Sequence, residues 1–326
     1  QSHGGTEIMK LLYLECNMGA AGDMLMGALA DLLPDKQSFA DRMNRLGIPG
    51  VHVELQNAVK CGIVGTHAEV SVNGTEEESL EVPTDAHAGE NTPVHEVHSH
   101  SHGHHGGAGH LEESDHHTDP GHLADPVPQE HPEPAAQDPA FPEHASGLYH
   151  VHTHSHAHHG MTEIDHRIEH LDIPEQVKRD VKSIYQIIAE AEASVHGRPV
   201  SEIHFHEVGT ADALADITGC ALLIRELGAE KIVTSPINVG YGQVRCAHGI
   251  LPVPAPATAR ILEGVPCYAG RIEGELCTPT GAAILKYYSD EFCRLPQMII
   301  RKTGYGMGKK DFPAANCVRA VLGESI

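Results

Sequence analysis

A long segment in the middle of this chain lacks the residues needed to build a hydrophobic core. From about Thr75 to Gly160 the sequence is mainly histidine, proline, glycine and acidic residues, without the aliphatic spacing typical of helices or strands. Such a segment buries too little apolar area to offset the entropy lost on ordering. We therefore expect residues 75–160 to be a His-rich, acidic, disordered insertion in a folded domain made of residues 9–74 and 161–326.

The charge of the chain is concentrated in the same region. No Lys or Arg occurs between Cys61 and His166, whereas this stretch contains 19 of the 45 Asp and Glu residues. The formal net charge of the whole chain is −23 with neutral histidines. Because such a surface repels phosphate backbones and anionic lipids, we expect neither nucleic acid nor membrane as a partner. Cations are the expected partners.

Cysteine use and hydropathy indicate the compartment. The eight cysteines are spread over the chain without a CxxC pair, which is typical of a reducing compartment. No apolar run is long enough to span a bilayer, and no charged-then-apolar leader opens the chain. We expect a cytoplasmic protein whose native start is Met9, with residues 1–8 a remnant of cloning. The oligomeric state is left open.

The regions flanking the insertion alternate between strand and helix patterns. Residues 10–16 predict a buried strand, and a glycine-containing turn then leads into an apolar helix that Asp23 can cap and Pro34 ends. Further strands are expected at residues 51–59, 66–72 and 231–234, and further helices at residues 163–171, 175–196, 211–227 and 281–288. This alternation predicts an α/β or α+β layered domain.

Alternating histidines are the strongest compositional signal. The chain has 28 histidines, and 18 of them lie between His95 and His159. Neutral imidazole binds borderline divalent ions, among which Ni²⁺ stands near the top of the affinity order. A spacer without a metal role is the alternative. The candidate ligands in this tract are His98, His100, His102, His104, His152, His154, His156 and His158.

A second group of candidate ligands follows the insertion. If residues 203–207 are extended, His204 and His206 point to one face with side chains about 7 Å apart. Asp212 and Asp216, four residues apart on the expected helix, share a face as well. Glu207 lies between the two pairs. The alternative is a packed histidine beside acids that complement the helix dipole.

Two weaker motifs offer soft ligands or an anion site. Cys246 and His248, two residues apart, can face one soft metal ion, or can be a core cysteine beside a turn histidine. The turn from Gly19 through Gly22 to Asp23 could present backbone N–H groups to a phosphate, or be a plain tight turn. Asp23 could instead hold a metal ion or act as a base, with Cys16 just before the turn.

Two further glycine-containing segments resemble phosphate-binding turns. Thr278 and Thr280 stand at the expected start of a helix, where a capped turn favours an anion. The run from Gly304 to Lys310 places glycines beside Lys309 and Lys310. A hairpin turn with solvated lysines is the alternative for this second segment.

Four separated blocks of the sequence resemble the LarC nickel insertion family. They occur in the family's order and cover nearly all of the chain outside the insertion, and an internal histidine-rich segment is also seen in that family. The blocks run from Tyr13 to Met24, from His204 to Gly209 with Asp212 and Asp216, from Asn238 to Thr258, and from Gly274 to Gly281.

The resemblance implies a function in cofactor maturation. The substrate would be pyridinium-3,5-bisthiocarboxylic acid mononucleotide, and a chelatase or lyase type of reaction would insert nickel to form the nickel-pincer cofactor of lactate racemase, whose apo form would be the acceptor. It also implies CTP with Mn²⁺ or Mg²⁺ for the full-length form. The sequence stops about where a CTP-associated C-terminal domain would begin, so we expect a longer gene product to supply that domain.

Roles can be assigned on this interpretation. Chemistry would be carried by Asp23, Cys16 and Glu207, and the nucleotide would meet Gly19, Gly22, Thr278 and Thr280. Nickel would pass through His204, His206, His248, Asp212 and Cys246. Two alternatives stay open, a nickel store or metallochaperone without catalysis and a metal-dependent hydrolase that uses the His204, His206, Asp212 and Asp216 group.

Overall fold

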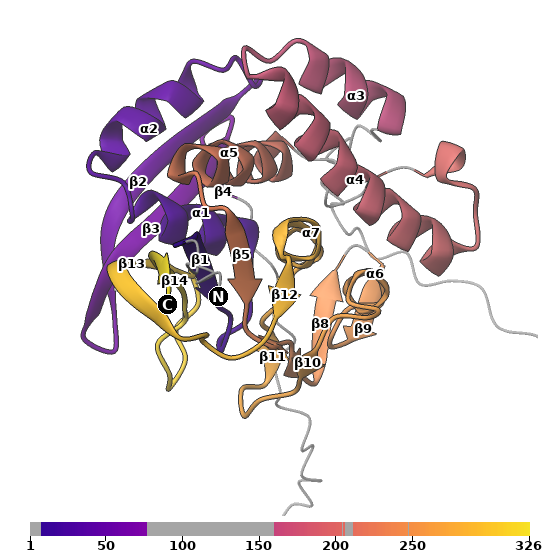
Figure 1. Cartoon of the computed structure of the whole chain (residues 1–326). Coiled ribbons are helices and arrows are strands. Elements are labelled where there is room, and N and C mark those ends of the chain that lie inside the picture. The colour runs from indigo at the N-terminus through magenta and orange to yellow at the C-terminus, as the bar shows by residue number, and fades with distance from the viewer. Residues whose placement is uncertain (1–7, 77–159, 204, 206–210, 247) are drawn as a thin grey trace, which may run out of the picture. The chain divides into compact units, whose positions relative to one another are not determined.

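The computed structural model describes residues 8–76, 160–203, 205, 211–246 and 248–326 (Figure 1). All of these residues belong to one of the two compact units into which the chain divides. The expected insertion lies outside the described residues. In the described part of the chain, no helix is long and apolar enough to cross a membrane.

A mixed sheet of eight strands joins the two flanking regions. Its order is β12-β5-β1-β14-β13-β3-β2, with β4 paired to β3. β1 and β12 run parallel to β5, whereas β14 is antiparallel to both of its neighbours and β2 to β3. The strands are β1 (Lys10–Glu15), β2 (Val51–Lys60), β3 (Ile63–Val72), β4 (Thr75–Glu76), β5 (Lys231–Thr234), β12 (Glu291–Phe292), β13 (Met298–Met307) and β14 (Cys317–Ser325).

Three small strand pairs follow β5 along the chain. They pair β6 with β10, β7 with β11, and β8 with β9. In Figure 1 they lie beyond the arrowhead of β5, on the side where β1 also ends. Their bounds are β6 (Ile237–Asn238), β7 (Gly240–Tyr241), β8 (Gln243–Cys246), β9 (Gly249–Pro252), β10 (Cys267–Tyr268) and β11 (Gly274–Glu275).

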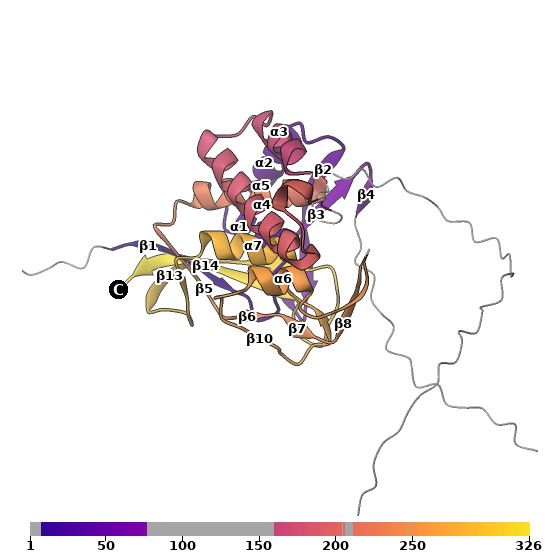
Figure 2. The ribbon, with the colours of Figure 1, turned by 90° about the vertical axis from the view of Figure 1, so that its right-hand side faces the viewer.

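The helices share one hydrophobic core with one face of the large sheet (Figure 2). On β1 the side chains of Leu12 and Leu14 enter this core, whereas Leu11 and Tyr13 enter a small cluster on the opposite face. This is the period-2 alternation of a strand. The helices are α1 (Gly22–Ala30), α2 (Lys36–Asn44), α3 (Met161–Glu169), α4 (Glu175–His196), the 3₁₀ turn η1 (Val200–Glu202), α5 (Ala211–Leu227), α6 (Pro256–Ile261) and α7 (Pro279–Tyr288).

Glycines allow α1 to pack directly on the sheet. A Cβ atom on Gly306 of β13 would lie 1.8 Å from the carbonyl oxygen of Met24 and 2.4 Å from the amide nitrogen of Ala28. A Cβ atom on Gly304 would lie 2.5 Å from the carbonyl oxygen of Ala28. Gly304 and Gly306, which were expected in a turn, lie within β13, so the glycine-turn interpretation is wrong for these two glycines.

Most long elements agree with the sequence expectations, and two short helices were not expected. The helices at 175–196 and 211–227 and the strand at 231–234 are confirmed. The first helix ends at Ala30, before Pro34, and the next residue, Asp31, accepts hydrogen bonds from Thr66 Oγ1 and the Tyr305 amide. The unexpected helices are α2, capped by Asp35, and α6.

Candidate functional site

The turn between β1 and α1 is held against the start of α7. The amide of Ala20 donates to the carbonyl of Leu276 at 3.0 Å, and the amide of Thr278 donates to the carbonyl of Ala20 at 3.0 Å. Gly19 has φ +79°, and a Cβ atom there would lie 1.9 Å from the Leu276 carbonyl oxygen. Only glycine satisfies both conditions, so Gly19 has a packing role in this turn.

The start of α7 is capped by its own threonine. Thr278 Oγ1 accepts from the amide of Gly281 at 3.2 Å, as the sequence predicted for a capped turn. A Cβ atom on Gly281 would lie 2.2 Å from the Ala20 carbonyl oxygen, and Thr280 is buried. The two helix starts are therefore packed against each other. Nucleotide binding by Thr278 and Thr280 stays a prediction.

Cys16 directly follows β1 and is buried. Its amide donates to Ser235 Oγ at 2.9 Å, and its carbonyl accepts from the amides of Gly19 and Asn238. The thiol is buried, and burial followed by the charge of Glu15 raises its pKa. The neutral thiol is favoured in this conformation, which speaks against a ready thiolate at Cys16.

Asn238 connects the loops that surround this turn. Its Nδ2 donates to the carbonyl of Asn17 at 2.8 Å, and its Oδ1 accepts from the amides of Gly240 and Gly270 at 3.1 and 3.0 Å. The side chain is only 4% exposed. One buried amide group thus joins the segment after β1 to the segments after β6 and β10.

Three carboxylates gather where α1 and α5 begin. Asp216 of α5 lies against Gly22, where a Cβ atom would be 2.4 Å from Asp216 Oδ2. The backbone N–H of Asp23 donates to the Asp216 carboxylate, and the negative charges of Asp23 and Asp212 act on this carboxylate. Gly22 is required because the carboxylate fills the space that a side chain would occupy. Nucleotide binding by Gly22 stays a prediction.

Asp23 does not have the capping position that the sequence suggested. The N-cap residue of α1 is Ala21, which has no side-chain cap, and Asp23 lies inside the first turn. Its Oδ1 accepts from the amide of Met24 at 2.7 Å. Asp216 from the neighbouring helix accepts the first-turn N–H group instead. The cap prediction for Asp23 is therefore wrong, because a tertiary contact replaces the local one.

The three carboxylates of this cluster carry charges of the same sign and disfavour each other's ionised form. Burial, followed by the charges of Asp23 and Asp212, raises the pKa of Asp216 well above its usual range, while the Lys309 ammonium opposes this rise. Lys309 is positioned by Lys60, whose Nζ donates to the carbonyl oxygens of Lys309 and Lys310. Burial, followed by the charges of Asp212 and Asp216, raises the pKa of the Tyr185 hydroxyl in α4.

The raised pKa of Asp216 predicts a pH-dependent difference between the chain and Asp216→Asn. Between the unfolded and the folded pKa the native state holds more protons, so stability falls as pH rises through this window. Asparagine cannot ionise and still accepts the Asp23 N–H. In metal-free buffer we expect similar melting temperatures near pH 4 and an increasing advantage of Asp216→Asn toward pH 8. Parallel melting curves over this range would contradict a buried titrating carboxylate.

Cys246 and His248 lie at the tip of the β8–β9 hairpin. Cys246 pairs with Gly249 across the tip, and the His248 ring lies 5.0 Å from the ring of His196 at the end of α4. His196 Nε2 lies 3.4 Å from Glu192 Oε2 on the same helix. His196 and Glu192 were not singled out from the sequence, although a Glu and a His four residues apart on a helix share a face.

The structure separates the candidate residues into two places. The first place is the carboxylate cluster, whose charges act on Tyr185 of α4. The second is the ring contact between His248 and His196, and His196 lies 11 residues after Tyr185 on α4. At about 1.5 Å per residue this is about 16 Å along the helix. His204, His206, Glu207 and the histidines of the tract lie outside the described residues. Among the residues that are described, no three His, Cys, Asp or Glu side chains form a metal-binding group.

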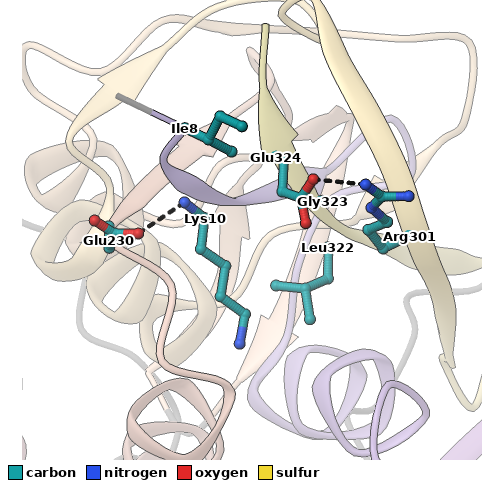
Figure 3. Close-up of a pocket in the computed structure, with 7 residues that line it drawn as sticks. All are labelled: Ile8, Lys10, Glu230, Arg301, Leu322, Gly323 and Glu324. Carbon is teal, nitrogen blue, oxygen red and sulfur yellow. Dashed lines mark hydrogen bonds and ion pairs between the residues drawn. The ribbon is translucent and has the colours of Figure 1, made fainter. Parts of the chain in front are cut away.

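A shallow pocket lies at the other end of β1. It has a volume of about 230 Å³, and the backbone of Lys10 donates to Glu230 Oε1 there while Arg301 pairs with Glu324 at 2.7 Å (Figure 3). Arg301 and Glu324 form an ion pair there. None of the residues that the sequence singled out lines it, so it is not part of the candidate site.

A family model and several relatives agree on the family to which this chain is similar. Residues 12–326 match the family model described as nickel insertion protein. The pyridinium-3,5-bisthiocarboxylic acid mononucleotide nickel insertion protein of Geobacillus kaustophilus is 33% identical over 317 residues, which are 97% of this chain and 60% of that protein. The protein of the same name from Clostridium acetobutylicum is 35% identical over 97% of this chain and 64% of its own length. That of Desulfitobacterium hafniense is 47% identical over 177 residues.

This similarity extends over both flanking regions of the insertion. The chain spans about 60% of the length of the relatives that it matches almost throughout. No solved structure matches it. The family model begins within β1 and continues to the end of β14, so it includes every strand of the large sheet. The chain therefore belongs to the nickel insertion protein family.

Proposed function

We propose that this chain takes part in nickel insertion into pyridinium-3,5-bisthiocarboxylic acid mononucleotide, the reaction for which its relatives are named. The family membership is the observation that carries the proposal. Two groups of candidate ligands in the described residues support it: the carboxylates at the starts of α1 and α5, and the histidines and cysteine at the β8–β9 hairpin and the end of α4. The abundance of histidine supports it as well, because imidazole is a good ligand for Ni²⁺.

The nickel route in this proposal uses the β8–β9 hairpin. His248, with Cys246 and the newly found His196, supplies nitrogen and sulfur ligands at the end of α4. Such ligands suit nickel better than oxygen ligands alone. His204, His206 and Glu207 follow α4 in the sequence, and Asp212 begins the next helix, so we assign them to the transfer between the hairpin and the start of α5. Glu207 keeps the role of a candidate catalytic group.

The finer parts of the proposal follow from the resemblance described above. They are a chelatase or lyase type of reaction, a requirement for CTP with Mn²⁺ or Mg²⁺ in the full-length form, and transfer of the finished cofactor to apo-lactate racemase. A C-terminal domain from a longer gene product would supply the CTP site. The proposed compartment is the cytoplasm, where the free thiols seen in the described residues persist.

Calorimetry tests the proposal by measuring binding of Ni²⁺ and of the pyridinium mononucleotide separately. We expect several weak nickel sites and one tight site in the full chain. A variant in which a short Gly/Ser linker replaces residues 78–158 should keep the tight site and mononucleotide binding while losing the weak sites. If all nickel binding disappears with that segment and the mononucleotide never binds, the chain is a nickel store or metallochaperone.

Single substitutions locate the tight site. In the variant without residues 78–158, His248→Ala should weaken the tight nickel site by about tenfold or more, the usual loss when a metal-site residue is removed. His52→Ala, on the exposed edge of β2, is the matched control and should bind nickel as the parent does. Equal nickel affinity in all three proteins would remove His248 from the route. Hydrolysis of simple phosphate esters by the variant that lacks residues 78–158 would favour the hydrolase alternative.

A further inference from the structure

One oxygen of Asp216 has a structural explanation. Oδ2 lies against Gly22, and the carboxylate accepts the N–H of Asp23 in the first turn of α1. This contact provides the N-terminal cap that α1 otherwise lacks. It is also favourable with respect to the dipole of α1. The capping contact explains the position of Asp216 but leaves its second oxygen unexplained.

The second oxygen and a neighbouring hydroxyl have no partner. Asp216 Oδ1 and the Tyr185 hydroxyl are both shielded from solvent, and neither has a hydrogen-bond partner in the described part of the chain. Tyr185 is completely buried, and its hydroxyl lies in the field of Asp212 and Asp216. Buried polar atoms without partners are costly, about 1–3 kcal/mol each, and native proteins seldom retain them without a ligand or water.

The surrounding charges indicate what kind of ligand fits. Three carboxylates converge here from α1 and α5, and Lys309 is the cation that acts on Asp216. An anionic ligand is disfavoured by these charges, whereas a cation offsets them. Asp23, Asp212 and Asp216 are each only partly buried as residues, whereas Asp216 Oδ1 is itself shielded from solvent, so an ion would have to enter beside the exposed parts of these residues.

The donor atoms indicate the class of cation. Carboxylate and phenol oxygens are hard ligands, which favour Mg²⁺ or Mn²⁺ over softer ions. The nearby thiol of Cys220 donates to the carbonyl oxygen of Gly22, and burial raises its pKa, so no thiolate competes. No group of three coordinating side chains is assembled among the described residues. This fits Mg²⁺, which commonly takes one or two protein carboxylates and keeps several waters.

We propose that Asp216 and Asp23 bind one hydrated divalent cation of the Mg²⁺ class between the starts of α1 and α5. Asp216 Oδ1 is the direct ligand, and the Tyr185 hydroxyl forms a hydrogen bond with water of the ion's shell. Asp212 adds negative charge nearby. The site is distinct from the histidine and cysteine ligands of the β8–β9 hairpin, and it does not depend on the proposed nickel function.

Mg²⁺ titration of the full chain tests this site in the absence of nickel and mononucleotide. Calorimetry should give one site per chain, and the melting temperature should rise with Mg²⁺ concentration because the ion binds the folded state. Asp216→Asn keeps the cap acceptor but removes the charged ligand, so its Kd for Mg²⁺ should rise by at least about tenfold. Tyr185→Phe should raise the Kd by a smaller factor. Imidazole is a poor ligand for Mg²⁺, so the histidines do not obscure the result.

Asp180→Asn is the matched control. Asp180 is a buried carboxylate of α4, but its oxygens accept from Tyr287, Tyr288 and Gln176 at 2.8–3.1 Å. This variant should bind Mg²⁺ as the parent does.

The proposal is overturned if the folded parent shows neither a binding heat nor a rise in melting temperature at millimolar Mg²⁺. Unchanged Mg²⁺ affinity in Asp216→Asn overturns it equally. If Asp216→Asn does not fold, Asp23→Asn replaces it as the test of the cation site. This variant keeps the hydrogen bond from the Met24 amide and should still bind Mg²⁺ more weakly than the parent. Failure of nickel or mononucleotide binding leaves these outcomes unaffected, so the two proposals are tested separately.

Discussion

Gly306→Val is expected to abolish folding of the described unit. The new Cβ atom would lie 1.8 Å from the Met24 carbonyl oxygen and 2.4 Å from the Ala28 amide, both backbone atoms of α1. Since a helix backbone cannot yield locally, α1 must leave the sheet, and we expect a loss of more than about 4 kcal/mol in unfolding free energy. Soluble yield, circular dichroism and urea unfolding measure the effect.

The control for this substitution is on the same strand. Thr303→Val introduces the same residue three positions earlier on β13, where the side chain is exposed. Its unfolding free energy should stay within about 0.5 kcal/mol of the parent. Folding of Gly306→Val with nearly parental stability would show that α1 does not rest on β13 as closely as described.

Asn238→Leu should destabilise the chain by about 3–5 kcal/mol. Leucine has nearly the same size but leaves the Asn17 carbonyl and the amides of Gly240 and Gly270 without their partner. Each buried group left unpaired costs about 1–3 kcal/mol. Urea unfolding measures the loss. The turn before α1 should also lose its fixed position, because Asn238 no longer holds the Asn17 carbonyl.

An exposed asparagine provides the comparison for Asn238. Asn57 on β2 accepts a single hydrogen bond from Lys36 Nζ at 2.6 Å, at the surface. Asn57→Leu should cost less than about 1 kcal/mol because water replaces the lost partner. If both asparagine variants have the same unfolding free energy, the three buried hydrogen bonds of Asn238 are not important for stability.

Local patterns were sufficient for the long elements. The helix at 211–227 and the strand at 231–234 were bounded correctly because apolar spacing, a following glycine and a short aliphatic run are all local signals. The two strands expected at 51–59 and 66–72 form the hairpin of β2 and β3, which turns at Cys61 and Gly62, both at positive φ in the structure. The helix at 36–44 was missed because only Phe39, Ala40 and Met43 are buried in a mostly polar segment.

The candidate site depended more strongly on tertiary contacts. The sequence placed Asp212 and Asp216 on one helix face, but nothing local indicated that Asp216 would cap a different helix. Gly22 looked like part of an anion-binding turn, although its missing side chain makes room for a carboxylate. Tyr185 and His196 lie on an expected helix, yet their importance arises only from what faces them.

The order of strands in the large sheet restricts when this protein can fold during synthesis. Of the strands in this sheet, β14 is the last to leave the ribosome, but it lies between β1 and β13. Before residues 317–325 emerge, the strands form at most two separate ribbons, β12-β5-β1 and β13-β3-β2. Until that strand emerges, the two ribbons cannot join into one sheet, so a nascent chain should need chaperone protection at least up to the arrival of β14.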